Sequence, residues 1–453
     1  IPSRLVGSEM CIRDREEQTA NEAQIFRDFK NILYYESFYK EETWRQQGLS
    51  LDFTLESDKI FREMEFMGFF TRTRSSAFFA APDRFYSGAH WALDQSKYFN
   101  FGLNYVNLFD ISATYNGSDE RFSNSVIAYN GELKHKIEET ELSLHGESGF
   151  SFVKHKNFEN APEDYSDYFF DFGFTAKLKG LEATLSYRNV GPEYMSAGAQ
   201  TRRINYATDP FIFPDIDNGE RNRPLTLMDM VYDDRLYNTQ IDTRLDTFKL
   251  QYTNAEPYGV VTPNRTGVTV DVKYTESKKE ALDIFLKTSY LSEVIGVGTA
   301  EKRNFLLIKG GFDFHINKLF DYDRNITVNL GAQMESTNRG GTEIETVDLS
   351  STLIEAGLEA ELVDKLDFLV GAKLFSTNGI EYAAVRDEYN NIFRYNTINI
   401  DQKETLLATG LKYRFNENIF LSAQFIKSNW KNNLKDEDSY NINRVLLLFD
   451  LRF

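Results

Sequence analysis

The sequence predicts an all-β fold, a single antiparallel transmembrane β-barrel of about 16 to 18 strands. Most of the chain after residue 50 alternates apolar and polar side chains with a period of two, which is typical of strands with one apolar face. The connections between these strands are alternately short and long, as they are in barrels that cross a membrane. The range of 16 to 18 strands combines the number of strand-like stretches along the chain with the even strand number of bacterial single-chain barrels.

The alternation is clearest in two stretches. Residues 326–335 are apolar at every even position, and the odd positions are polar apart from one glycine. Residues 441–453 are apolar at every second position from Val445 to Phe453. The same period predicts strands at 51–56, 61–73, 86–94, 99–105, 124–136, 140–153, 168–178, 181–187, 268–274, 282–286, 306–316, 326–335, 346–362, 366–376, 404–415, 418–430 and 441–453.

The connections fall into two classes of length. Long polar connections are expected near 155–166, 190–235, 254–265, 293–302, 337–345, 377–395 and 431–440. Short connections are expected near 137, 179, 277, 363 and 416, with a medium one near 317–324. The longest, at about 190–235, is unusual for a compact soluble domain but ordinary for a loop of a barrel.

Composition supports a barrel and excludes one class of partner. Aromatic residues make up 15% of the chain, while all hydrophobic residues together reach only 41%. This balance suits a barrel with a polar lumen and aromatic side chains at both membrane rims. No apolar run approaches the roughly 18 residues that a membrane-spanning helix needs. The formal net charge of −18 argues against a nucleic-acid partner, which would require a basic surface.

The chain divides into three parts. Residues 1–15 share neither the composition nor the period of the rest, and we expect them to be a non-native leader of adaptor or cloning origin. Residues 16–47 are expected to form a short helix or a frayed first strand, and residues 48–453 the barrel. The single cysteine, Cys11, lies in the leader, so the sequence predicts neither a disulfide framework nor a thiolate metal site.

Charged side chains on the polar face of the strands are the candidate lumen lining. In a soluble sheet they would form a solvated face, but a barrel of this width leaves an aqueous channel. The candidates are Lys309, Asp313, Glu355, Glu359, Glu361, Lys373, Lys412 and Arg414.

The long loop carries a second group of charges. It either folds inward and narrows the pore or covers the barrel from outside, and the sequence leaves both possibilities open. The residues of this possible constriction are Arg202, Arg203, Asp215, Asp217, Arg221 and Arg223.

No residue pattern indicates catalysis. The acidic stretch from Asp215 to Glu220 lacks the glycine and the final glutamate of a calcium-binding loop. The five histidines are scattered without the spacing of metal ligands. We therefore expect no enzymatic activity, no metal site and no cofactor.

The chain after residue 50 resembles bacterial outer-membrane β-barrels, and its Tyr- and Asn-rich strands and acidic loops look like those of Bacteroidota. The final strand resembles the signal that the barrel-assembly machinery reads, which would assign this role to Phe449, Leu451 and Phe453. The resemblance implies a Gram-negative outer membrane, short periplasmic turns and long extracellular loops. It also implies contact with outer-membrane lipids and lipopolysaccharide.

For a barrel of this width, the resemblance implies porin-like passive diffusion of small solutes or ions. A structural or secretion-associated platform with a blocked lumen is the alternative within the same fold. A secreted, soluble β-sandwich or solenoid with solvated polar faces is the alternative outside it.

Overall fold

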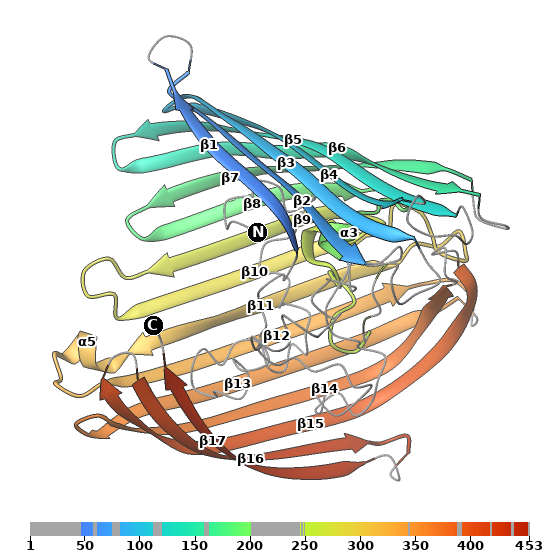
Figure 1. Cartoon of the computed structure of the whole chain (residues 1–453). Helices are drawn as coiled ribbons and strands as arrows, with labels where there is room; N and C mark the ends of the chain where they lie inside the picture. Colours follow the sequence, from blue (N-terminus) through green and yellow to red (C-terminus); the bar gives the residue numbers. More distant parts are fainter. Residues whose placement is uncertain are drawn as a thin grey trace.

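Each strand of the computed structural model pairs antiparallel with its neighbours along the chain, and 17 strands form one curved sheet (Figure 1). The structure describes residues 47–57, 61–74, 82–111, 120–157, 163–200, 245, 248, 250–342, 345–386, 392–416, 419–435 and 439–451. The predicted fold class, an all-β antiparallel barrel sheet with a strand number in the predicted range, is confirmed. The predicted leader and the predicted short helix or frayed strand lie outside the described residues, apart from Gln47, with which the first described strand begins.

The strands are β1 (Gln47–Glu56), β2 (Glu63–Arg74), β3 (Asp83–Ser96), β4 (Phe99–Ile111), β5 (Arg121–Ile137), β6 (Thr140–Lys156), β7 (Tyr165–Leu178), β8 (Leu181–Val190), β9 (Arg265–Thr275), β10 (Leu282–Ser292), β11 (Asn304–His315), β12 (Ile326–Arg339), β13 (Val347–Val363), β14 (Leu366–Arg386), β15 (Ile392–Asn416), β16 (Ile419–Asn432) and β17 (Tyr440–Leu451). Short helical turns are α3 (Ala197–Gln200), η5 (Gly259–Val261) and α5 (Ile316–Phe320). No helix among the described residues is both long enough and apolar enough to cross a membrane.

Short turns and long loops alternate along the sheet. β7 and β8 are joined by Lys179 and Gly180, whose φ angles are 45° and 86°. Positive φ at both central residues matches the twist of the flanking strands in a two-residue hairpin. Glycine is required at the second position because a Cβ there would lie 2.1 Å from the carbonyl oxygen of Thr275.

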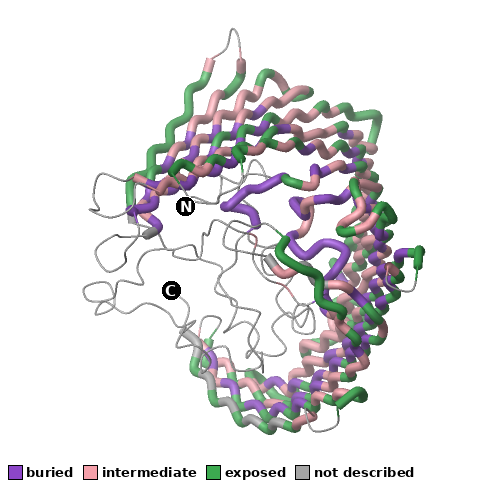
Figure 2. The backbone as a smooth tube through the Cα atoms, turned by 90° about the vertical axis from the view of Figure 1, so that its right-hand side faces the viewer, coloured by how far each residue is buried: buried purple, intermediate pink, exposed green. Residues whose placement is uncertain are grey.

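The two faces of the sheet differ in exposure. Val445, Leu447 and Phe449 of β17 are 79%, 71% and 63% exposed on what we call the outer face. Buried and exposed positions alternate along the strands, and buried stretches of chain lie in the space around which the sheet curves (Figure 2). We call the side facing that space the inner face. An exposed apolar outer face is the surface that lipid covers in a transmembrane barrel.

The last strand lies partly where the sequence places it. β17 pairs with β16 from Tyr440 opposite Trp430 to Leu451 opposite Ile419, as predicted. A second predicted pairing joins the last strand to the first. Among the described residues, no residue of β17 pairs with a residue of β1, so closure of the barrel stays a prediction.

The longest connection extends beyond its predicted boundary. β8 ends at Val190 and β9 begins at Arg265, so residues 191–264 separate them, instead of about 190–235. Two apolar residues of the additional stretch pack against the inner face of the sheet, which we also call the wall. Leu250 packs with Leu349 of β13, and Tyr252 packs with Phe375 of β14. These two residues are two positions apart and both contact the inner face. The described residues of their segment nevertheless form no strand.

The connection expected at 377–395 is shorter than predicted. β14 continues to Arg386 and β15 begins at Ile392, and the two strands pair along most of this stretch. The polar residues there belong to paired strands, because backbone pairing does not require an apolar side chain.

Candidate lumen and its inward segments

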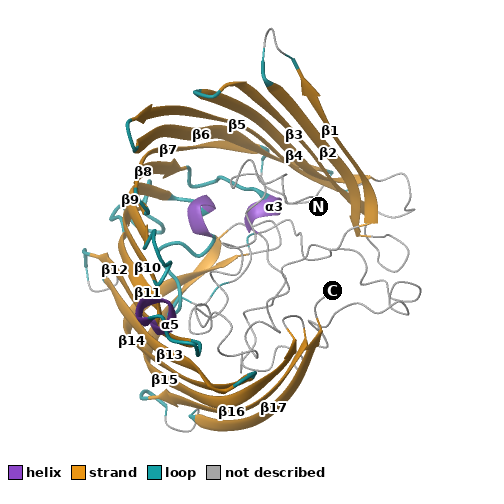
Figure 3. Ribbon diagram, turned by 90° about the vertical axis from the view of Figure 1, so that its left-hand side faces the viewer, coloured by secondary structure: helices purple, strands orange, loops and turns teal. Residues whose placement is uncertain are grey.

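Two parts of the long connection lie on the inner face of the sheet. We call residues 191–200 the first inward segment and residues 250–264 the second inward segment. Both are largely buried, and α3 and the loops beside it lie inside the curve of the sheet (Figures 2 and 3). Residues 191–200, the described part of the predicted long loop, thus lie inward, while its charged residues are outside the described part and their constriction role stays a prediction.

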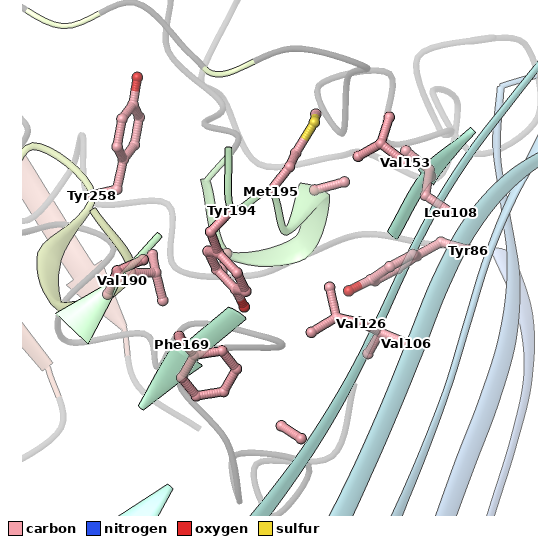
Figure 4. Packing of buried hydrophobic residues seen from close by; sticks show 14 of the residues in the cluster. Tyr86, Val106, Leu108, Val126, Val153, Phe169, Val190, Tyr194, Met195 and Tyr258 are labelled. Carbon is pink, nitrogen blue, oxygen red and sulfur yellow. The ribbon is translucent and has the colours of Figure 1, made fainter. Parts of the chain in front are cut away.

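The first inward segment rests on an apolar part of the wall. Tyr194 and Met195 are each 1% exposed and belong to a cluster with inner-face residues of β2 to β8 (Figure 4). The ring of Tyr194 lies 5.2 Å from that of Phe169 in an edge-on arrangement. Burial of large aromatic side chains contributes most of the hydrophobic stabilisation of such a contact.

Asn124 of β5 supplies the polar part of this first anchor. Its side-chain oxygen accepts a hydrogen bond from the backbone N–H of Ala197 at 2.8 Å, and its amide donates to the carbonyl of Met195 at 3.0 Å. Gln200 donates to the carbonyl of Val261 at 2.8 Å, which joins the two inward segments. The buried backbone groups of this turn are thus satisfied by the wall and by the other segment.

The second inward segment is held by carboxylates of β12 and β14. The backbone N–H of Asn254 donates to Glu335 at 2.9 Å, and its side-chain amide donates to Glu381 at 2.6 Å and to Thr337 at 3.0 Å. Hydrogen bonds to ionised acceptors are about twice as strong as neutral ones. One asparagine thereby fixes the segment to two strands.

Glu256 attaches the second inward segment to β8 and β10 as well. Its carboxylate lies 2.8 Å from Arg188 and 3.1 Å from Lys287. Burial raises the pKa of Glu256, but the charges of Lys287 and Arg188 outweigh burial and lower the pKa from its usual 4.5 to about 2. The carboxylate is therefore ionised at neutral pH.

Arg265, at the start of β9, holds the backbone of the same segment. Its guanidinium donates to the carbonyl oxygens of Asn254 and Ala255, both at 3.0 Å, and stacks 3.7 Å from the ring of Phe305. A planar guanidinium can donate several hydrogen bonds while its face contacts an aromatic ring. In addition to the apolar contacts of Leu250 and Tyr252, the second inward segment is thus held by polar and charged groups of β8 to β14.

Most candidate lumen residues form ion pairs between strands, within the adjacent pair β13 and β14 or across β14 from β15 to β13. Lys373 lies 3.6 Å from Glu355, Lys412 pairs with Glu359, and Arg414 lies 2.8 Å from Glu361. The pairs stand on the inner face, at the positions opposite the apolar outer side chains. These charges of the inner face are thus paired with charges of opposite sign, which offsets the cost of burying them.

Two further candidates lie on the same face. Asp313 accepts a hydrogen bond from Asn329 of β12. Lys309 lines a small pocket together with Gln333 and Glu355. The structure thus brings Lys309 close to Glu355, while Asp313 belongs to a separate pair nearer the short turns.

Several inner-face residues were not among the candidates. Asp367 forms ion pairs with both Lys412 and Arg414, and it also accepts a hydrogen bond from Arg414. Glu335 and Glu381 hold Asn254, and their positions opposite apolar side chains were the available signal for the lumen. Nothing in the local sequence of residues 250–264 indicates its long-range contacts with these strands.

Other predicted site residues are outside the described part. The possible constriction residues Arg202, Arg203, Asp215, Asp217, Arg221 and Arg223 fall among residues 201–244. Of the predicted assembly signal, Phe449 is exposed on the outer face, while Phe453 and the side chain of Leu451 are not described. Within the described residues, no group of three or more His, Cys, Asp or Glu side chains could hold a metal ion.

No protein-family model and no curated protein matches the chain. Among solved structures, the alcaligin outer membrane receptor FauA from Bordetella pertussis is 9% identical, with a TM-score of 0.40, over 88% of this chain and 61% of its own. The ferripyoverdine receptor of the outer membrane of Pseudomonas aeruginosa is 11% identical, with a TM-score of 0.40, over 91% of this chain and 58% of its own.

A mutant porin of Rh. blastica is 9% identical, with a TM-score of 0.17, over 78% of this chain and 98% of its own. The chain spans 61% and 58% of the lengths of the two receptors.

Proposed function

We propose that the chain is an outer-membrane β-barrel through which small solutes or ions diffuse passively, past a constriction made by the two inward segments. The observation that carries the proposal is the contrast between the faces of the sheet. Apolar side chains are exposed on the outer face, and charged pairs such as Lys373 with Glu355 stand on the inner face. This is the distribution of a barrel with lipid outside and an aqueous lumen inside.

The inward segments would set the width of this path. They lie on the inner face and are held at β5 by Asn124 and at β12 by Glu335. A connection anchored on two sides of a wall stays in place during permeation, because several buried hydrogen bonds would have to break together. The remaining charged groups of the wall would then line the open part of the lumen and influence ion preference.

Single-channel recording in planar bilayers tests this function. Folded wild-type protein should give stepwise currents, and the Glu335→Ala variant should give larger steps, because it removes the acceptor that holds Asn254. Ser336→Ala is the matched control, since the neighbouring residue stands on the opposite face of β12. Absence of stepwise current from both wild type and Glu335→Ala would contradict a pore.

One observation favours a barrel whose lumen is closed, which would act as a structural or secretion-associated platform. Lys373 and Glu381 are fully buried although they stand on the inner face. If the inward segments cover the whole lumen, wild type should give no current and Glu335→Ala should create one. The same recording therefore separates the two functions.

The membrane itself can be tested independently of current. A transmembrane barrel should fractionate with the outer membrane, need detergent for extraction and migrate faster on a denaturing gel before heating than after. Protein that remains soluble without detergent would contradict a membrane location, whatever the conductance.

A further inference from the structure

Two lysines on adjacent strands stand directly opposite each other on the outer face. Lys403 of β15 is the register partner of Lys431 of β16, and both side chains are exposed. Lys427, also exposed, lies four residues from Lys431 on the same face of β16, or roughly 13 Å along the strand. We call these three residues the outer lysine patch.

The outer lysine patch begins where the apolar outer face ends. Lys427 is paired with Leu407 of β15, and Phe425 is the next outer residue of β16 towards the short turns. On β17, the outer residue beside Phe425 is Val445, and the one beside Lys427 is Asn443. The lysines therefore lie at the border of the apolar band nearest the long loops, where lipid headgroups contact a barrel.

Like charges directly opposite in a sheet are destabilising. No carboxylate of the described residues forms an ion pair with any of the three lysines, although the protein carries a net charge of −18. The nearest outer carboxylate on β15, Asp401, accepts a hydrogen bond from Asn433. An anion from outside the chain would offset the repulsion between Lys403 and Lys431.

The outer face is not equally basic at its two ends. Lys154 and Lys156 of β6 are also exposed, on the long-loop side of Phe152. At the opposite end of β15, the outer positions are held by Tyr413 and Phe415, which contact each other edge-on. On β6, β15 and β16, the exposed lysines of the outer face therefore lie towards the rim that carries the long loops.

We propose that the outer lysine patch binds the phosphate groups of a phosphorylated glycolipid, lipopolysaccharide, in the outer leaflet. The proposal rests on the proposed outer-membrane location, with the long loops outside. Lysine stems lie along the apolar band while their ammonium groups reach the headgroup level. Each lysine near an anionic headgroup strengthens binding about fivefold, so the three together contribute up to about a hundredfold.

Native mass spectrometry of the folded protein in detergent, titrated with lipid A, tests the proposal. The variant is Lys403→Gln combined with Lys427→Gln and Lys431→Gln. The matched control removes the same charge at the short-turn rim, through Lys97→Gln, Lys278→Gln and Lys365→Gln, all exposed. A gel shift on heating establishes that each variant is folded before binding is measured.

The patch variant should bind lipid A up to about a hundredfold more weakly than wild type, and the control should bind as wild type does. Replacement of the same three residues by arginine should preserve binding, and added salt should weaken it. Equal binding by the patch variant, or an equal loss in the control, would overturn the proposal.

Two other lipids identify the partner. Wild-type binding should be weaker for lipid A without its phosphates and for phosphatidylglycerol. If phosphatidylglycerol bound as tightly as lipid A, the assignment to a glycolipid would be overturned. Because no current is measured, a failure here is distinct from a failure of the pore function.

Discussion

The two inward segments are held against the same wall by different forces. The first inward segment packs apolar side chains, Tyr194 and Met195, against apolar residues of β2 to β8. The second inward segment places Asn254 and Glu256 among carboxylates and cations of β8 to β14. One connection of the barrel thus has an apolar anchor and a charged anchor.

The difference indicates how each anchor should respond to solution conditions. Apolar burial depends little on pH or salt, because no charge changes. The charged anchor depends on ionised Glu256 and on Glu335 as a hydrogen-bond acceptor, and it loses attraction when either is replaced or when Glu256 is protonated. The first inward segment should therefore be the permanent attachment, and the second should be the one that conditions can release.

The largest effect is expected from the apolar anchor. Phe169→Ala should lower the free energy of unfolding by about 3–5 kcal/mol, because Phe169 is fully buried and contacts Tyr194. Phe172→Ala is the matched control on the same strand, since that ring is 51% exposed on the outer face. Denaturant unfolding in detergent measures both, and equal losses would contradict an apolar anchor inside the barrel.

Removal of one acceptor from the charged anchor should cost somewhat less. Glu335→Ala leaves the backbone N–H groups of Asn254 and Ala255 without their acceptor, and we expect a loss of about 3 kcal/mol, since each buried orphan costs about 1–3 kcal/mol. Glu335→Gln keeps an acceptor and should retain most of the stability. Limited proteolysis should cleave residues 250–257 in the alanine variant first, and cleavage at residues 191–200 first would contradict the prediction.

Acid should weaken the charged anchor through Glu256. Its pKa is lowered in the folded protein to about 2, so the stabilisation is complete above the usual 4.5 and is lost as pH falls towards about 2. Between neutral pH and about pH 3, the loss should be about 2 kcal/mol. The Glu256→Gln variant should lack this part of the pH dependence, and an unchanged acid profile in that variant would exclude Glu256 as its source.

The smallest effect is expected from a charge pair remote from both anchors. Lys279 lies 2.6 Å from Asp321 across two short turns, and both side chains are largely exposed. Lys279→Ala should change stability by less than about 1 kcal/mol and leave conductance unaltered. A change in conductance would mean that charge alone, without contact to the inward segments, affects the pore.

Strand positions and face assignments were predictable from the sequence because both follow from a local period of two. The apolar residues of 326–335 and the outer residues of β17 are examples, as is the hairpin turn at Lys179 and Gly180. The charged candidates lie on the inner face for the same reason. Register and turn chemistry are local, so a single sequence contains them.

The anchors were not predictable because they depend on contacts distant in sequence. Asn254 meets Glu335 and Glu381, which are 81 and 127 residues away, and nothing near Asn254 indicates either partner. The spacing of Leu250 and Tyr252 reads as part of a strand, and only the wall behind it explains why it is not one.

The central claim, that the second inward segment lies against the inner wall, is most directly tested by a disulfide cross-link. Ser351 of β13 donates a hydrogen bond to the carbonyl of Gln251 at 2.6 Å, so we expect cysteines at these two positions to form a cross-link. The background is Cys11→Ser, since Cys11 is the single cysteine of the chain. Gln251→Cys with Thr352→Cys is the control, because Thr352 stands on the outer face.

Mild oxidation of the protein in native membranes should cross-link the pair with Ser351→Cys and not the pair with Thr352→Cys. Reduction should reverse the cross-link. No cross-link in the first pair, or equal cross-linking in both, would contradict an inward segment fixed to the lumen wall.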